Sequence, residues 1–305
     1  MSHKNAKAPV AVFVYNRPDH AHQMLEALND NEGADLTDLF IFADAAKNED
    51  GQAAVDAVRK VIHDFTNHSR FASVTLREAK ENLGLRRSII SGVTSVMEEY
   101  GRIIVVEDDL VCRKNFLKYM NDALDMFEND ERIWSLAGHT RDFPELADYP
   151  YDFYLTRRAC SWGWGMWKDR WDTIDWEVSD YDSFVHNPYR RWRYARGGAD
   201  LFKMLDNDMH GKSNSWALRN QYSMAKTECF TIYPKHTFVY NIGLDGSGTH
   251  CTATKNDTVV TLEGEPYVLD PNLQFNARVN RGFLHSIYPN LYERGVRKLK
   301  KMLSH

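Results

Sequence analysis

Cysteine is scarce in this 305-residue chain, and its apolar runs are short. Cys112, Cys160, Cys229 and Cys251 are widely spaced and form no C-x-x-C pair. This spacing favours reduced thiols in a cytosolic protein over a disulfide framework or a zinc site. The longest apolar runs have the length of strands, and the opening segment MSHKNAKAPV has no signal-peptide core. We therefore expect neither a membrane-spanning helix nor a secretory leader.

An excess of positive charge is also missing. The formal net charge is −5, and the chain carries no recognisable nucleic-acid-binding motif, which argues against a nucleic-acid partner. With 43% hydrophobic residues, the chain can bury a sizeable core, as one large domain or two fused small ones. Ligands must therefore be sought in individual sites rather than in the overall charge.

The glycine-rich phosphate loops are absent as well. The chain has no G-x-x-x-x-G-K-[ST] sequence, and no G-x-G-x-x-G follows its first predicted strand, where a dinucleotide-binding fold would need it. The segment YNRPDH stands there instead. Asn16 and Arg17 are polar and cationic groups that suit a nucleotide or its phosphates, and Pro18 suits the first turn of a helix. A lone arginine at a strand end is, however, more often a surface charge.

Short β-rich runs alternate with helical stretches over residues 9 to 140. The predicted strands are 9–16, 39–44, 72–79, 102–109 and 133–139, and the predicted helices between them are 18–30, 50–66, 84–99 and 113–129. This alternation predicts an α/β fold with right-handed crossovers and a mostly parallel sheet covered on both faces. Ligands of such sheets bind beyond the carboxyl ends of the strands. The polar residues expected at those ends are Asn16, Arg17, Asp44, Glu107, Asp108 and Asp109.

The second half of the chain differs in composition. It is rich in aromatic and basic residues after residue 150, and no Pro/Gly/Ser linker separates it from the first half. We therefore predict a single domain over 1–305, with a ligand-binding half at 9–140 and an acceptor or lid half at 141–288. A basic amphipathic helix is predicted at 289–305. Such a helix suits the surface of an anionic membrane, and a solvated helix docked on the domain is the alternative.

The segment IIVVEDDLV carries three consecutive carboxylates at the end of a predicted buried strand. Alternation along a strand predicts that Glu107 and Asp109 point to one side and Asp108 to the other. Carboxylates so close repel one another unless a cation joins them. Mg²⁺ or Mn²⁺ is the natural partner, because it is held by one or two carboxylates together with water and substrate phosphate. The alternative is that Asp108 or Asp109 caps the helix expected near Arg113.

Several segments, taken in order, resemble a known family. PVAVFVYNRPDH, FIFADAAKN, ENLGLRRSIISGV and IIVVEDDLVCRKNFLKYM look like successive parts of a GT-A nucleotide-sugar glycosyltransferase. VEDDL followed by an amphipathic helix is similar to the N-acetylglucosaminyltransferase I group. SWGWGMWKDRW, NSWALRN and NIGLDGSGTHC further resemble bacterial family-2-like transferases of surface-polysaccharide clusters. The resemblance covers most of residues 9 to 252 and implies a GT-A, Rossmann-like fold.

The resemblance also implies roles for individual residues. Asp109 would ligate the Mn²⁺ or Mg²⁺ that bridges the donor diphosphate, and Asp108 would lie near the ribose. Asp44 would meet the base, usually uracil. The remaining residues implied to line the nucleotide or metal site are Asn16, Arg17, Arg86, Arg87, Glu107 and His250. For His250 the alternative is a structural or solvent-facing histidine.

A general base for the acceptor hydroxyl is missing from its usual place. The similar enzymes carry an Asp at or near NSWALRN, where this chain has Ser215, Ala217 and Leu218. Asp245, in the glycine-rich segment GLDGSGTH, is the best substitute, although D-G is also an ordinary turn signal. The rivals are Asp172, Asp175 and Glu177. Without an assigned base, inverting and retaining mechanisms both stay open.

The tryptophans of the second half can be interpreted in two ways, as core residues or as residues that contact a sugar. Trp162, Trp164, Trp167 and Trp171 follow at spacings of two, three and four, so part of the set can share a helical face in the core. SWGWG precedes the predicted helix, and an aromatic face exposed there would stack on a sugar ring. We expect Trp162 or Trp164 to touch the acceptor or donor sugar. Arg219, on a predicted helix at 215–227, would reach a phosphate or lie on a solvated helix face.

The expected activity is that of a metal-dependent hexosyl- or N-acetylhexosaminyltransferase. It would move a sugar from a UDP donor to a glycan or lipid-linked acceptor of a bacterial surface polysaccharide such as lipopolysaccharide. We expect it in the cytoplasm, at the inner face of the cell membrane if it is peripheral. One alternative is a nucleotide-sugar pyrophosphorylase, which would need a basic glycine-rich loop after the first strand. The other is a non-catalytic nucleotide-sugar- or glycan-binding protein, which the missing base keeps open.

Overall fold

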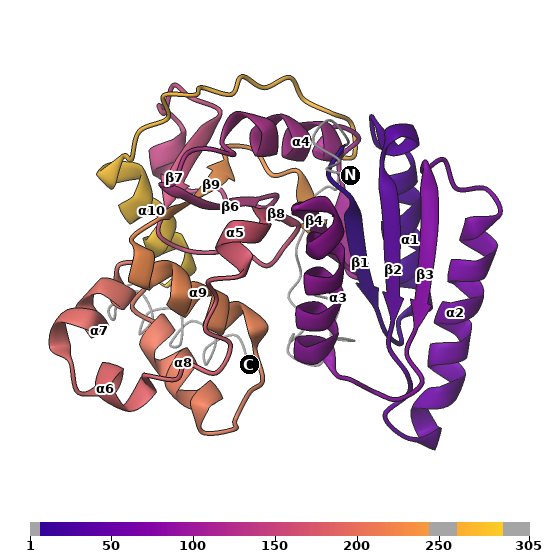
Figure 1. Ribbon diagram of the computed structural model, residues 1–305. Helices are drawn as coiled ribbons and strands as arrows, with labels where there is room; N and C mark the ends of the chain where they lie inside the picture. Colours follow the sequence, from indigo (N-terminus) through magenta and orange to yellow (C-terminus); the bar gives the residue numbers. More distant parts are fainter. Residues whose placement is uncertain (1–6, 244–260, 289–305) are drawn as a thin grey trace, which may run out of the picture.

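A computed structural model describes residues 7–243 and 261–288 of the chain (Figure 1). Its centre is an eight-stranded sheet in the order β3-β2-β1-β4-β8-β6-β9-β7. The strands of this sheet are β1 (Val10–Val14), β2 (Asp38–Ala43), β3 (Ser73–Glu78), β4 (Arg102–Glu107), β6 (Ile133–Ala137), β7 (Phe153–Thr156), β8 (Trp164–Trp167) and β9 (Phe230–Pro234). A separate two-stranded antiparallel ribbon pairs β5 (Leu110–Cys112) with β10 (Val239–Asn241).

Helices flank the sheet on both faces. The helices of the first half are α1 (Pro18–Asn29), α2 (Gln52–Thr66), α3 (Leu85–Tyr100) and α4 (Phe116–Met126). Those of the second half are α5 (Lys168–Trp171), α6 (Tyr181–Val185), α7 (Pro188–Ala195), α8 (Leu201–Met209), α9 (Trp216–Thr227) and α10 (Ala277–Ile287). Short 3₁₀ turns lie at Ala34–Leu36, Glu49–Gly51 and Pro144–Leu146.

The two faces of the sheet build separate cores. Alternate residues of β1 face opposite sides, with Val10 and Val12 packed among side chains of α1, α2 and α4. Ala11 and Phe13 pack on the other side, among side chains of α3 and α9. Burial on both faces explains why these strands read as continuous apolar runs. The α/β class, the mostly parallel sheet and its flanking helices are confirmed.

Both halves of the chain contribute strands to the same sheet. β3, β2, β1 and β4 run parallel to one another. β8, from the second half, pairs antiparallel with β4 on one side and with β6 on the other. β6 therefore points the same way as β4, and the carboxyl ends of β1, β2, β4 and β6 meet at one edge. β9 is parallel to β6, and β7 closes the sheet antiparallel to β9.

The helical assignment of the tryptophan segment is wrong. Trp164 to Trp167 form β8, and only Lys168–Trp171 is helical. The strand lies between β4 and β6 and is buried on both faces, with Trp164 and Met166 in one core and Trp167 in the other. Trp164 and Trp171 stack with ring centroids 5.9 Å apart, and Trp216 of α9 lies 5.2 Å from Trp164.

Within residues 7–243 and 261–288, no helix has the length and hydropathy needed to cross a bilayer. Cys112, Cys160 and Cys229 are free thiols, as their spacing predicts. The predicted helix at 289–305 and Cys251 lie outside the described residues.

Candidate functional site

The acid cluster meets Arg17 at the carboxyl edge of the sheet. Arg17 follows β1, and its Nη2 donates to Oδ2 of Asp109 at 3.1 Å and, more closely, to Oδ1 of Asp108. β1 and β4 are neighbours, with Phe13 opposite Glu107. Two strand ends that are about 90 residues apart in the chain thus place a guanidinium against two carboxylates, as the strand-end argument predicts.

The predicted alternation of the three carboxylates is wrong. β4 ends at Glu107, and Asp108 and Asp109 form the turn that leads into β5. Side chains alternate only while the backbone stays extended. The turn brings both aspartates to the same guanidinium. Helix α4 begins at Phe116, and no side-chain hydrogen bond caps it, so the capping alternative for Asp108 and Asp109 is excluded.

Negative charge in this cluster is only partly compensated. Burial raises the pKa of Glu107 to about 8, and repulsion from Asp109 and Asp108 adds to this rise. Burial also raises the pKa of Asp108, although Arg17 opposes the shift. Three carboxylates therefore share one nearby guanidinium. A second cation at this place would be stabilised by the same charges that now repel one another.

The ribbon of β5 and β10 closes one side of the cluster. The backbone N–H of Ile242 donates to the carbonyl of Asp109 at 2.8 Å. Gly243 comes so close that a Cβ atom added there would lie 2.5 Å from Oδ2 of Asp109 and 2.7 Å from Nη1 of Arg17. Only a glycine leaves room for both side chains. Gly243 was not among the predicted site residues, although the glycine-rich NIGLDGSG segment signals a close backbone approach.

Asp44, at the end of β2, is buried and fully engaged. Its carboxylate accepts hydrogen bonds from the backbone N–H groups of Ala45, Leu83 and Gly84, each at 2.9 Å, and from the side chain of Asn82 at 3.1 Å. These bonds hold the segment that enters α3, where Gly84 has φ +71°. In this structure Asp44 shapes the edge of the site. Its contact with a base stays a prediction. Asn16 is exposed beside Arg17.

Arg86 and Arg87, in the first turn of α3, face different surroundings. Arg86 donates to the carbonyl of Trp176 at 2.8 Å and pairs with Glu177 at 3.2 Å, so it joins the sheet to the helical half. Burial lowers its pKa, and Arg219 adds to this shift. Arg87 is exposed, and its side chain makes no hydrogen bond or ion pair within the part of the chain that the structure describes.

Trp162 and His139 form an aromatic pair near the same edge. His139 follows β6, and its ring lies 4.5 Å from that of Trp162, which precedes β8. Its Nδ1 is 3.1 Å from the carbonyl of Val239. Burial lowers the pKa of His139 to about 4, so the ring is neutral at pH 7. Trp162 is partly exposed whereas Trp164 is 1% exposed, so of the two tryptophans only Trp162 can offer a ring to a sugar. No sequence pattern had singled out His139.

Arg219 is buried on α9 and paired with Asp208, at the end of α8. Asp208 also accepts from the hydroxyl of Ser213 at 2.8 Å and from the backbone of Ser215 at 2.7 Å. No carboxylate occurs at 215–218, and that of Asp208 on α8 is already engaged by these contacts. The ion pair and the packing of α8 against α9 bury Arg219 and so exclude the alternative of a solvated helix face. Its contact with a phosphate stays a prediction.

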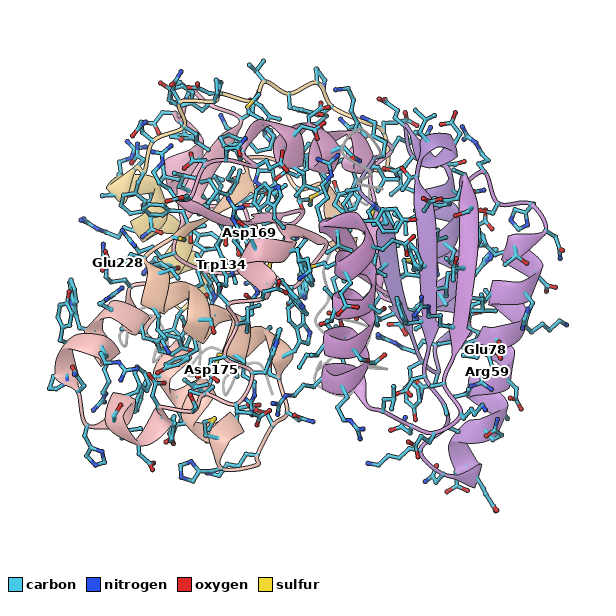
Figure 2. All side chains as sticks on the ribbon, in the orientation of Figure 1. Arg59, Glu78, Trp134, Asp169, Asp175 and Glu228 are labelled. Atoms are coloured by element: carbon cyan, nitrogen blue, oxygen red, sulfur yellow. The ribbon has the colours of Figure 1, made fainter. Side chains whose placement is uncertain are left out.

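The rival base candidates are also engaged. Asp175, which is labelled in Figure 2, accepts from the backbone N–H and the hydroxyl of Ser179 at 2.9 and 2.8 Å. Asp172 pairs with Lys168, and Glu177 with Arg86. Asp245 and His250 lie outside the described residues. Gly243, beside Asp109, is the last described residue before them.

No group of three or more His, Cys, Asp or Glu side chains suited to a metal ion occurs in residues 7–243 and 261–288. No model of a known protein family matches the chain. The structure thus brings together Arg17, Asp108 and Asp109, beside Glu107 and Gly243. It leaves Arg219 and Trp164 in the interior of the second half.

Proposed function

We propose that the chain is a metal-dependent glycosyltransferase of GT-A architecture that takes a UDP-sugar as donor. Its acceptor would be a glycan or a lipid-linked sugar of a bacterial surface polysaccharide. The observation that carries this proposal is the meeting of Asp108 and Asp109 with Arg17 where β1 and β4 end. A diphosphate needs positive charge, and a divalent cation needs carboxylates. This edge of the sheet offers both.

The residues present fit a divalent cation. Mg²⁺ and Mn²⁺ are bound through one or two carboxylates, with substrate phosphates and water completing the shell. A preformed group of three protein ligands is therefore not required. Asp109 is the carboxylate that would hold the ion, and Asp108, expected near the ribose, lies beside it on the same guanidinium. Burial and repulsion from these two neighbours raise the pKa of Glu107, and a bound cation would relieve that repulsion.

The chemistry explains why such a cluster is useful. When a sugar leaves a nucleoside diphosphate, negative charge develops on the β-phosphate, and a bound divalent ion supplies Lewis-acid stabilisation of that charge. Arg17, released in part from the aspartates, would donate to a phosphate oxygen. Because Gly243 has no side chain, its backbone can lie against the side chains of Asp109 and Arg17 without displacing either.

His139 and Trp162 would contact and orient the transferred or acceptor sugar. The partly exposed Trp162 ring offers an apolar face, and His139 is fixed by its bond from Nδ1 to Val239. Because Nδ1 donates there, Nε2 is left as an acceptor for a sugar hydroxyl. With a pKa of about 4, lowered by burial, His139 is a weak base, so we assign it to sugar orientation and keep Asp245 as the proposed base.

A non-catalytic nucleotide-sugar- or glycan-binding protein is the second candidate. The hydrogen bonds of Asp208 and Asp175 favour it, because these carboxylates are already engaged by the protein. The two candidates differ in turnover. A transferase should slowly hydrolyse its UDP-sugar to UDP when manganese is present, and a binding protein should not.

A thermal-shift panel tests the shared part of both candidates. Ligands that bind only the folded state raise the melting temperature by mass action. We expect UDP and UDP-sugars to raise it with manganese and to do so much less without the metal. ADP and GDP serve as matched controls for base selectivity. The absence of a shift with every nucleotide and metal would overturn the proposed nucleotide site.

A further inference from the structure

Helix α7 presents an exposed face of aromatic and basic side chains. Tyr189 and Trp192 are 61% and 57% exposed, and their rings stack with centroids 5.9 Å apart. A guanidinium lies over each ring, with Arg196 5.2 Å from Trp192 and Arg193 6.0 Å from Tyr189. Figure 1 shows α7 at the end of the molecule far from α2. Large aromatics that protrude in this way need an occupant that tolerates both apolar and charged groups.

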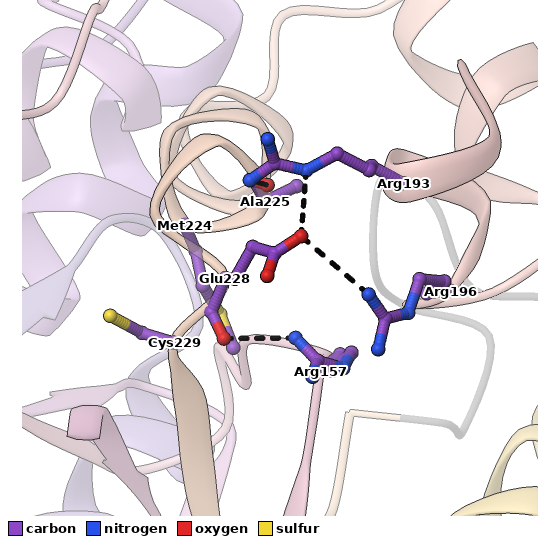
Figure 3. A pocket seen from close by; sticks show the side chains of 7 residues that line it. All are labelled: Arg157, Arg193, Arg196, Met224, Ala225, Glu228 and Cys229. Atoms are coloured by element: carbon purple, nitrogen blue, oxygen red, sulfur yellow. Dashed lines mark hydrogen bonds and ion pairs between the residues drawn. The ribbon is translucent and has the colours of Figure 1, made fainter. Parts of the chain in front are cut away.

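Basic residues outnumber acidic ones on this face, although the whole chain is acidic at −5. Residues 188 to 199 contain four arginines and no Asp or Glu. Arg193 and Arg196 share the one carboxylate of Glu228 (Figure 3), and Arg190 and Lys226 share Asp180. The side chain of Arg157 donates to the backbone carbonyl of Glu228 at 2.8 Å, and its guanidinium lies over the ring of Phe230. Burial lowers the pKa of Arg157, and repulsion from Arg196 adds to this shift.

A cavity of about 280 Å³ opens among α6, α7 and α9 beneath these side chains. Arg190, Arg193 and Lys226 line it together with Asp180, Tyr194 and Tyr222, among others. Asp180 is the acidic member of the lining, and it is already bonded to Tyr222 at 2.7 Å and to Arg190. A phosphate entering this cavity would meet three cations.

We propose that the face formed by Tyr189, Trp192, Arg193 and Arg196 docks the protein on an anionic phospholipid surface. Trp and Tyr favour the boundary between water and hydrocarbon, and clustered Lys and Arg are attracted to anionic head groups. The cavity lined by Arg190, Arg193 and Lys226 accepts one lipid phosphate. A soluble acidic glycan fits less well, because stacking and the two guanidinium contacts already cover ring surface that a sugar would need. This inference needs neither the nucleotide nor the metal site.

Vesicle co-sedimentation of the full chain tests the inference. We compare vesicles of phosphatidylcholine alone with vesicles that also contain phosphatidylglycerol, at low and at high salt. The chain should bind the anionic vesicles, bind the neutral ones weakly, and lose binding as salt rises. A charge variant, Arg193→Gln with Arg196→Gln, and an aromatic variant, Tyr189→Ala with Trp192→Ala, should each weaken binding about tenfold or more.

A charge-matched control is Lys60→Gln with Arg70→Gln. Lys60 lies on α2 and Arg70 follows that helix, and both are exposed, so this variant should bind like the unmodified chain. Unchanged melting temperatures would show that the variants fold. Three results would overturn the inference: equal binding to neutral and anionic vesicles, no binding to either, or unchanged binding in both α7 variants. Loss of binding to a soluble acidic polysaccharide in the variants, with vesicle binding unchanged, would assign the face to a glycan instead.

Discussion

Two groups of carboxylates, one in each half of the molecule, have opposite surroundings. In the first half, Glu107, Asp108 and Asp109 stand together against one arginine, and burial raises the pKa of Glu107 to about 8. In the second half, Asp208 is buried against Arg219, and Asp200 pairs with Arg158 at 2.8 Å. Losing one partner of a buried, saturated pair is costly to stability, whereas an under-compensated cluster at a strand edge is a candidate ligand site.

Breaking the saturated pair should have the largest effect. Asp208→Ala leaves the buried guanidinium of Arg219 without its counter-charge, which costs about 3–5 kcal/mol of unfolding free energy. Urea denaturation measures the loss. The double change Asp208→Leu with Arg219→Met should recover much of it, because no buried charge remains. A cost below about 1 kcal/mol for Asp208→Ala would place the pair among surface ion pairs.

Removing an acid from the under-compensated cluster should act on turnover instead. Asp109→Ala should lower the rate of UDP release from a UDP-sugar about a hundredfold or more, like other losses of a group that stabilises developing charge. Unfolding in urea should change little. The matched control is Asp64→Ala, an exposed acid of α2, which should keep full activity. Manganese-dependent turnover that survives Asp109→Ala would rule out the assigned role.

The close approach of Gly243 offers a subtler way to disturb the same cluster. Gly243→Ala would push a methyl group to 2.5 Å from Oδ2 of Asp109, and we expect about a tenfold loss in the affinity for UDP with manganese, about 1.4 kcal/mol. Gly51→Ala is the control, because its added Cβ has no neighbour closer than 3.5 Å. Calorimetric titration with UDP measures both. Equal affinities in the two variants would contradict the crowding at Gly243.

His139 should give the smallest effect at neutral pH, because its influence on stability appears only in acid. Burial lowers its folded-state pKa to about 4, so the folded protein disfavours the proton that the unfolded chain takes up near pH 6.5. Its neutral burial costs nothing above pH 6.5, and the free energy of unfolding falls as the pH drops from 6.5 towards 4, by about 3 kcal/mol for a shift of this size. His139→Gln should flatten this decline in urea titrations at several pH values. His186→Gln, at an exposed position, should leave the slope as it is.

The sequence predicts the first half better than the second, for physical reasons. The strands β1 to β4 are separated by helices of regular length, so their carboxyl ends, with Arg17 and Asp109, had to meet at one edge. β8 was missed because both of its faces are buried, which erases the alternation of a half-exposed strand. The spacing of its tryptophans also fits a helical face, which favoured a helix over a strand.

Contacts between residues that do not lie at the ends of regular strands could not be predicted from the sequence either. Asp208 and Arg219 are 11 residues apart on different helices, and their pairing depends on how α8 packs against α9. His139 meets Trp162 only because β6 and β8 are neighbours. The approach of Gly243 to Asp109 depends on the pairing of β10 with β5.

A crystal of the full chain soaked with manganese and UDP tests the central claim most directly, with anomalous diffraction to locate the metal. We predict a manganese ion held by Asp109 and bridging to the diphosphate, with Arg17 turned towards a phosphate oxygen. Bound UDP elsewhere on the molecule, with Arg17 still closed on Asp108 and Asp109, would contradict it.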